Sequence, residues 1–240
     1  MEKEQFNNEQ FVLYSPDTLK YITDSMDKVL LDTFEKYKSL FEIETFRKIQ
    51  INYFDDIEKF RKYIYDLRKE KESLPKYAKG TFDNGMINAY IETNIDKNSN
   101  KFNRTLFMAS HELFHIMYQE LILQKEKIKR IIWFDEGMAQ FFSGEFDMYL
   151  NEDNFPKWFN KVLDNTKEVP NLNLISHGEI FENDNYSGYD LSLLSIKYLY
   201  DSLGKKQLKQ MMHSNKKIEE YGSTIVNDAI NYYKEKLKKW

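Results

Sequence analysis

The chain has 240 residues, a mass of 29.0 kDa and a formal net charge of -4, which suits one domain or one domain built as two lobes. It contains no Cys, which excludes disulfides, thiolate metal sites and Cys nucleophiles, and its pI of about 5.7 argues against nucleic-acid binding. Neither an apolar run of membrane-spanning length nor a secretory signal is found in it, so we expect a cytoplasmic protein with no membrane partner.

The first part of the chain predicts strands separated by helices. Residues 10–14 and 47–53 are rich in aromatic and β-branched side chains and predict short strands. Over residues 19–40 apolar side chains recur every three or four positions, which predicts an amphipathic helix with Asp17 as its candidate cap. Residues 57–67 repeat this pattern and predict a charged surface helix.

Residues 80–92 differ in pattern from the helical segments before them and predict a β-hairpin. The run Asp83-Asn84-Gly85 is typical of a tight turn, and an alternating segment, 86–91, follows it. We therefore expect residues 86–91 to form a strand of a small sheet.

The remaining sequence is almost entirely helical in pattern. The polar residues 96–103 mark the expected boundary between two lobes of a single domain, 1–103 and 104–240, with Asn103 as a candidate N-cap. Residues 105–122 are apolar on more than one face, as in a central buried helix. Further helices are expected near Asp135, over about 189–203 and over about 223–238. The predicted fold class is α+β, with an α/β lobe followed by a mainly helical lobe.

Two of the four His of the chain stand four residues apart, in His111-Glu112-Leu113-Phe114-His115. At 3.6 residues per turn, both imidazoles lie on one face of a helix and can converge on one metal ion. Glu112 lies to one side of that face, where a carboxylate can take a proton from a metal-bound water. Three titratable groups on a buried helix are costly without a purpose, so this pattern predicts a metal site.

A catalytic zinc takes three protein ligands and an open position, so a third ligand must come from elsewhere. Glu136 is the candidate, because it follows His115 after a stretch long enough for the helix to end and a second helix to return. The small residues Gly137 and Ala139 beside it would let two helices approach closely.

These residues resemble the gluzincin zinc metallopeptidases, a group that includes thermolysin, the aminopeptidase N type, clostridial collagenases and smaller peptidase MA-like domains. The resemblance lies in His-Glu-x-x-His followed by Glu136 in a Trp-x-x-Glu-Gly-x-Ala setting. It implies a zincin-like fold with a small mixed sheet, an antiparallel edge strand and an active-site cleft between the lobes. It also implies one Zn²⁺ per chain, a peptide or protein substrate, and Glu112 as the general base.

Two further segments extend the resemblance to roughly residues 80–205. Asn88-Ala89-Tyr90 resembles the edge strand that binds extended substrate in the family. Tyr189, which we favour over Tyr186, resembles the family's oxyanion-stabilising Tyr before a helix.

The sequence also departs from the family pattern. Gln140 stands where a carboxylate commonly supports a zinc-binding imidazole, and a neutral partner makes that ligand less basic. The exopeptidase motif Gly-x-Met-Glu-Asn is absent, which favours an endopeptidase.

Two other function classes stay open beside a zinc peptidase. One is a catalytically inactive zinc-binding domain that acts as a binding or regulatory module, for which Gln140 is the hint. The other is a helical interaction protein in which the motif is a coincidence. Of the remaining His, His177 could assist an oxyanion but is better explained as a loop residue, and His213 is assigned no role.

Overall fold

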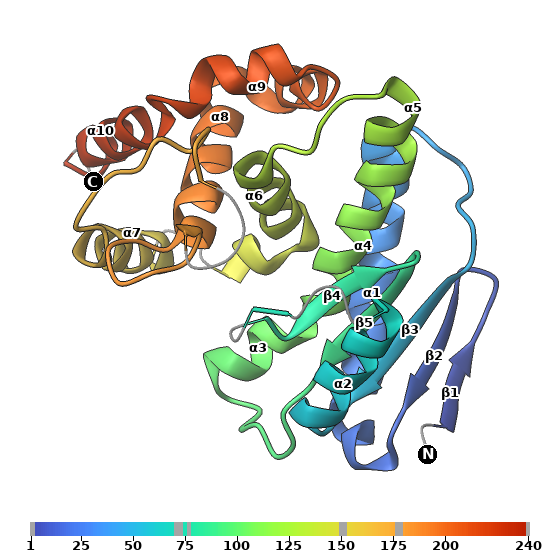
Figure 1. Cartoon of the computed structure of the whole chain (residues 1–240). Coiled ribbons are helices and arrows are strands. Elements are labelled where there is room, and N and C mark those ends of the chain that lie inside the picture. The colour runs from blue at the N-terminus through green and yellow to red at the C-terminus, as the bar shows by residue number, and fades with distance from the viewer. Residues whose placement is uncertain (1–2, 70–73, 76–77, 149–152, 176–179, 239–240) are drawn as a thin grey trace. The chain divides into compact units, whose positions relative to one another are not determined.

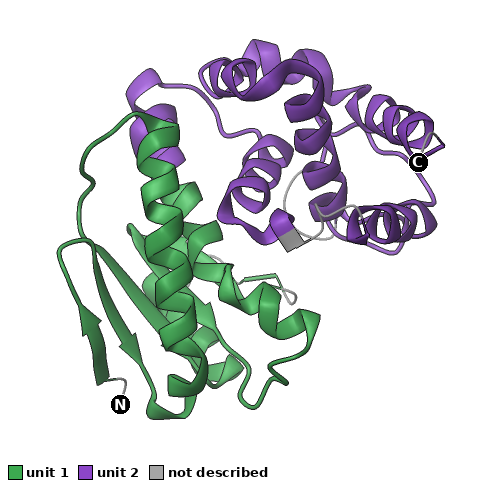
Figure 2. Ribbon diagram, turned by 180° about the vertical axis from the view of Figure 1, so that it is seen from behind, with its two compact units in different colours: residues 1–116 green, residues 117–240 purple. Residues whose placement is uncertain are grey.

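The structure is a computed structural model in which residues 3–69, 74–75, 78–148, 153–175 and 180–238 are described. The chain divides into two compact units, Met1–Ile116 and Met117–Trp240 (Figure 2). The division falls inside helix α4 (Met108–Tyr118), later in the chain than the polar segment 96–103. The assignment of the whole chain to one catalytic domain stays a prediction.

The strands of the first unit form one five-stranded mixed sheet in the order β1-β2-β3-β5-β4 (Figure 1). They are β1 (Lys3–Asn7), β2 (Phe11–Ser15), β3 (Ile49–Phe54), β4 (Gly80–Asp83) and β5 (Met86–Tyr90). Strands β2, β3 and β5 are parallel, and the outer strands β1 and β4 pair antiparallel to their neighbours. The sequence pattern missed β1, because its residues are mostly polar and lie at an edge of the sheet.

The helices of the first unit are a short 3₁₀ helix (Asp17–Leu19), α1 (Lys20–Phe41), α2 (Ile57–Leu67), α3 (Asn100–Leu106) and α4. Helices α1 and α2 lie close to the predicted ranges, whereas α3 begins within the segment 96–103 that was predicted as a polar boundary. The candidate caps, Asp17 for the helix over 19–40 and Asn103 for the helix over 105–122, were both wrong. Asp17 lies within the 3₁₀ helix and accepts hydrogen bonds from Lys3 and Gln5 instead. Asn103 lies inside α3, whose N-cap is Ser99.

The two faces of the sheet are covered by different helices. On one face, Phe54 packs against Phe60 and Ile64 of α2. On the same side, Arg68 at the end of α2 donates to Asp83 at 2.8 and 3.2 Å and to Thr81 at 3.0 Å. Successive side chains of a strand point to opposite faces, so the residues that alternate with Thr81 and Asp83 on β4 point to the other face.

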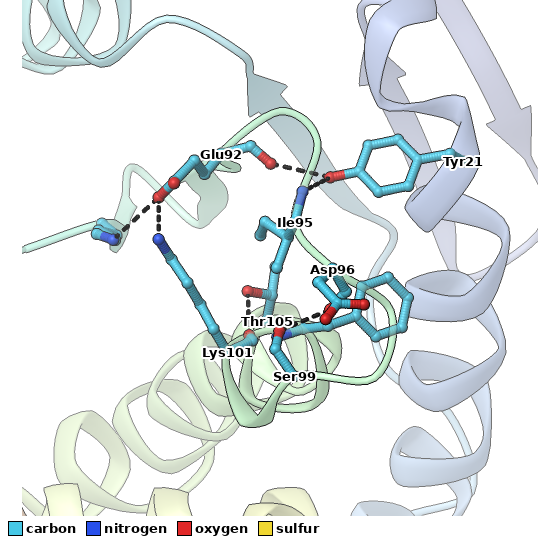
Figure 3. A network of polar contacts seen from close by, with 9 residues as sticks. Tyr21, Glu92, Ile95, Asp96, Ser99, Lys101 and Thr105 are labelled. Atoms are coloured by element: carbon cyan, nitrogen blue, oxygen red, sulfur yellow. Dashed lines mark hydrogen bonds and ion pairs between the residues drawn. The ribbon is translucent and has the colours of Figure 1, made fainter.

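The connection between β5 and α3 is held to α1 by a polar network (Figure 3). The Tyr21 hydroxyl donates to the Glu92 carbonyl at 3.0 Å and accepts from the Ile95 N–H at 3.3 Å. The Glu92 carboxylate forms ion pairs with Lys101 and, at 3.9 Å, with Lys79. This network fixes the chain that leads from the sheet to the helices α3 and α4.

The described part of the second unit is helical. After a π-helical segment (Gln119–Leu123), its helices are α5 (Gln124–Glu126), α6 (Ile132–Ser143), a 3₁₀ helix (Glu145–Met148), α7 (Asn154–Asn165), α8 (Gly188–Met211), α9 (Asn215–Gly222) and α10 (Ile225–Leu237). The sequence pattern missed α7 and α9. The first part of α8 ends at Gly204, where φ is 79°, in agreement with the predicted range 189–203. Among the described residues, no helix combines the length and apolarity needed to cross a membrane.

Candidate metal centre

Helix α4 brings two imidazoles together. The Nε2 atoms of His111 and His115 lie 3.0 Å apart, with ring centroids 4.7 Å apart and planes at 81°. The opposite surface of the helix is apolar and fully buried, for example at Ala109 and Leu113, which anchors the helix in the core. The spacing of four residues thus places both rings on one face, as the sequence predicts.

Glu112 lies against the first residue of strand β4. A Cβ atom built on Gly80 would lie 2.7 Å from Oε1 of Glu112 and 3.3 Å from Cγ of Met108. A side chain at position 80 would require the Glu112 carboxylate to shift from its place. Glu112 is 9% exposed, so its surroundings are formed largely by protein.

Strand β4 also contacts the second imidazole. The ring of Phe82 stacks on His115 with centroids 5.6 Å apart and an interplanar angle of 30°. Gly80 and Phe82 are alternate residues, so the face of β4 that they share is the one that lies along helix α4. Sequence reasoning did not select either residue. The signal that could have found them was the alternation in the first strand of the hairpin, which puts Gly80 and Phe82 on one face.

The prediction that residues 86–91 form an edge strand was wrong. Strand β5 is bonded to β3 on one side and to β4 on the other, so its backbone is fully paired within the sheet. Asn88 and Ala89 are 0% exposed, and the Asn88 side chain accepts a hydrogen bond from Asn52 at 2.8 Å. Asn88 is opposite Thr81 in the ladder, on the α2 face, and Tyr90 packs at the α2 cluster, so neither side chain faces α4.

Glu136 occupies a buried position in helix α6. It is 5% exposed, and Oε1 accepts from an Nη atom of Arg130 at 2.9 Å. The neighbouring Asp135 is 1% exposed and also forms an ion pair with Arg130, through its Nε. Sequence reasoning missed Arg130 and Asp135, although an Arg just before two adjacent acidic residues was a signal that could have found them.

The three predicted ligands form one group in the structure. One ligand atom from each of His111, His115 and Glu136 lies within 4.8 Å of the others. Two imidazole nitrogens on one tetrahedral zinc, each at about 2.0–2.1 Å, lie about 3.3 Å apart, close to the 3.0 Å observed. Two imidazoles and one carboxylate are also a known ligand set of catalytic zinc sites. The residues present therefore fit a metal ion.

Gln140 links α6 to the start of α8. Its amide nitrogen donates to the carbonyl of Tyr189 at 3.0 Å and, more weakly, to that of Glu136 at 3.4 Å. These bonds fix the first turn of α8, in which Tyr189 lies with its ring edge-on to Phe181 at 4.8 Å. The predicted support of an imidazole by Gln140 stays a prediction.

The competing Tyr has a hydroxyl bonded within its own loop. Tyr186 donates to the carbonyl of Ile180 at 2.7 Å. His177 lies outside the described residues, whereas Nδ1 of His213 lies 2.5 Å from Oε1 of Glu126 in an exposed pair. The choice of Tyr189 over Tyr186 stays a prediction.

The fold and this group together define an α+β protein with three residues that could hold a metal. In a comparison with solved structures, the chain is similar to an aminopeptidase N family protein from Idiomarina loihiensis, with a TM-score of 0.51 and 15% identity. The match covers 100% of this chain and 44% of that protein, so the chain spans less than half of its relative's length. No known family matches the sequence, and no curated protein does. At this identity the similarity shows a shared fold and no more.

Proposed function

We propose that the chain is a zinc-dependent metallopeptidase in which His111, His115 and Glu136 hold one zinc ion. The observation that carries this proposal is the convergence of these ligand atoms to within 4.8 Å. A peptidase-like fold, found independently of the motif, supports it. A coincidental motif in a helical interaction protein would not require either feature.

Each of the proposed site residues then has a chemical role. When bound, zinc would polarise a peptide carbonyl and lower the pKa of water. The Glu112 carboxylate would take the proton of the attacking water and deliver it to the leaving amine. The close packing of the carboxylate against Gly80 supports this role, because it holds Oε1 beside the edge strand of the sheet. Tyr189 would donate to the developing oxyanion.

Strand β4 replaces β5 as the proposed strand for substrate. The Lys79 carbonyl accepts from the Tyr90 N–H at 2.7 Å, so the backbone of residues 79, 81 and 83 is directed at β5. The N–H and C=O groups of Gly80 and Phe82 are therefore directed to the outer edge of the sheet. An extended peptide could add there as a further strand, alongside the face that contacts Glu112 and His115.

The finer parts of the proposal concern specificity. An endopeptidase is proposed because the chain lacks the exopeptidase motif Gly-x-Met-Glu-Asn. A peptide or protein substrate and a cytoplasmic location stay predictions.

The first test is the metal content of untagged protein purified without chelators, measured by elemental mass spectrometry. We expect about one zinc per chain, its loss in His115→Ala, and cleavage of members of a peptide library by the zinc-loaded protein. One zinc without any cleavage would instead identify the inactive binding module. No zinc after reconstitution at neutral pH would contradict the proposal.

A further inference from the structure

Arg130 contacts two buried carboxylates that follow one another in helix α6. Its guanidinium donates to Glu136 at 2.9 Å and forms an ion pair with Asp135. The Arg130 side chain is 26% exposed, whereas those of Asp135 and Glu136 are 2% and 6% exposed. Ionised carboxylates at such depth are costly to bury unless a cation or several hydrogen bonds compensate them. Arg130 supplies such a cation for both.

We propose that Arg130 is a positioning residue that holds the Glu136 carboxylate in the absence of metal and sets the affinity of the site by competing with the metal for it. The inference rests on the proposed zinc site. A guanidinium and a divalent cation on the same carboxylate repel each other and share its charge. The Arg130–Glu136 contact is therefore weaker in the zinc-bound protein than in the zinc-free protein.

Asp135 is a second carboxylate that binds Arg130. Because Arg130 binds both carboxylates, the guanidinium keeps a partner when zinc takes charge from Glu136. The arrangement stabilises the zinc-free chain at a cost in zinc affinity. By linkage, what zinc does to the Arg130 contact, Arg130 does to zinc binding to the same degree.

The alternative is that Arg130 only orients Glu136 for the metal. The two explanations predict opposite changes in affinity when the guanidinium is removed. Competition predicts that Arg130→Gln binds zinc more tightly, whereas orientation alone predicts weaker binding. Both predict a less stable zinc-free protein, so stability by itself does not decide between them.

The experiment measures zinc affinity by competition with a chromophoric chelator and the denaturant midpoint of the zinc-free protein. For Arg130→Gln we expect zinc affinity to rise about tenfold, within the usual range of coupling between sites, while the midpoint falls. Arg130→Lys keeps the charge but not the fork that spans both carboxylates, and should give intermediate values; it also provides the answer if Arg130→Gln fails to fold.

The matched control is Lys197→Gln, which breaks a partly buried ion pair with Asp201 in α8 of the same unit. It should lower the midpoint and leave zinc affinity unchanged. Unchanged or weaker zinc binding in both Arg130 variants would overturn the inference alone. Failure of the unmodified protein to bind zinc would overturn the proposed function, and the inference with it.

Discussion

The two carboxylates proposed to act at the metal have different neighbours. Glu112 packs against Gly80, a residue with no side chain, where a Cβ atom would come within 2.7 Å of its Oε1 atom. Glu136 lies against Arg130, a cation that binds it directly. A general base must be held where it can take a proton, whereas a metal ligand that is buried as an anion needs a compensating charge. The different neighbours of Glu112 and Glu136 thus suit two residues of the same type to different roles.

The largest effects are expected when each of the two carboxylates is neutralised in turn. Glu112→Gln should keep one zinc and lose hydrolysis by about 10²–10⁴-fold, because only the proton acceptor is removed. Glu136→Gln should lose zinc as well, since a ligand is removed. Elemental analysis and peptide cleavage on the same preparations measure both. Hydrolysis retained in Glu112→Gln would contradict the assignment of Glu112 as the general base.

Filling the space beside Glu112 should have a smaller effect. In Gly80→Ala the new Cβ would lie 2.7 Å from Oε1, so the end of a flexible side chain must move. We expect kcat to fall by about 10–100-fold with little change in zinc content or stability, because a misplaced base is costly to catalysis.

The matched control for Gly80→Ala is Gly204→Ala. That position has nothing within 4 Å but a φ of +79°, so a side chain there strains the backbone without touching the site. It should lower stability by about 1 kcal/mol and leave kcat unchanged. Equal losses of kcat in the two variants would show that the clearance at Gly80 has no catalytic role.

Replacement of Asp27, a residue of α1, should change stability and leave activity unchanged. Burial, and then the Asp24 carboxylate, raise the pKa of Asp27 from its ordinary value of 3.8 to about 7. The folded state therefore binds a proton that the unfolded state releases, and stability falls as pH rises from about 4 to about 7. After a discount for partial exposure, Asp27→Asn should add about 1–3 kcal/mol at pH 8.

Denaturant unfolding between pH 4 and pH 8 measures this effect. The gain in Asp27→Asn should shrink toward zero as the pH falls to about 4, where protonation of the carboxyl in the unfolded state removes most of the difference between the two states. A gain that does not depend on pH would contradict the shifted pKa. Cleavage of peptides should be unchanged throughout.

How far the sequence predicts this protein depends on how local each feature is. Helix α2 was predicted with its observed bounds, 57–67, and the structure adds its cap, Asp56, which accepts from the N–H groups of Glu58 and Lys59. The hairpin was predicted because Asn followed by Gly favours the positive φ that a two-residue turn requires, and the structure confirms it with φ of 49° at Asn84 and 71° at Gly85. Helix caps failed where a neighbouring strand took the side chain, as at Asp17.

The α+β class and the group on α4 could be predicted from the sequence. The group could be predicted because His111, Glu112 and His115 lie within two turns of one helix and their spacing fixes their directions. Which strand of the hairpin forms the edge of the sheet, in contrast, depends on tertiary contacts. Both strands have alternating patterns, and an inner position depends on pairing with β3, a partner distant in sequence. The contact of Arg130 with Glu136 was decided in the same way, since side-chain ion pairs depend on where the chain turns before α6 and not on residue type alone.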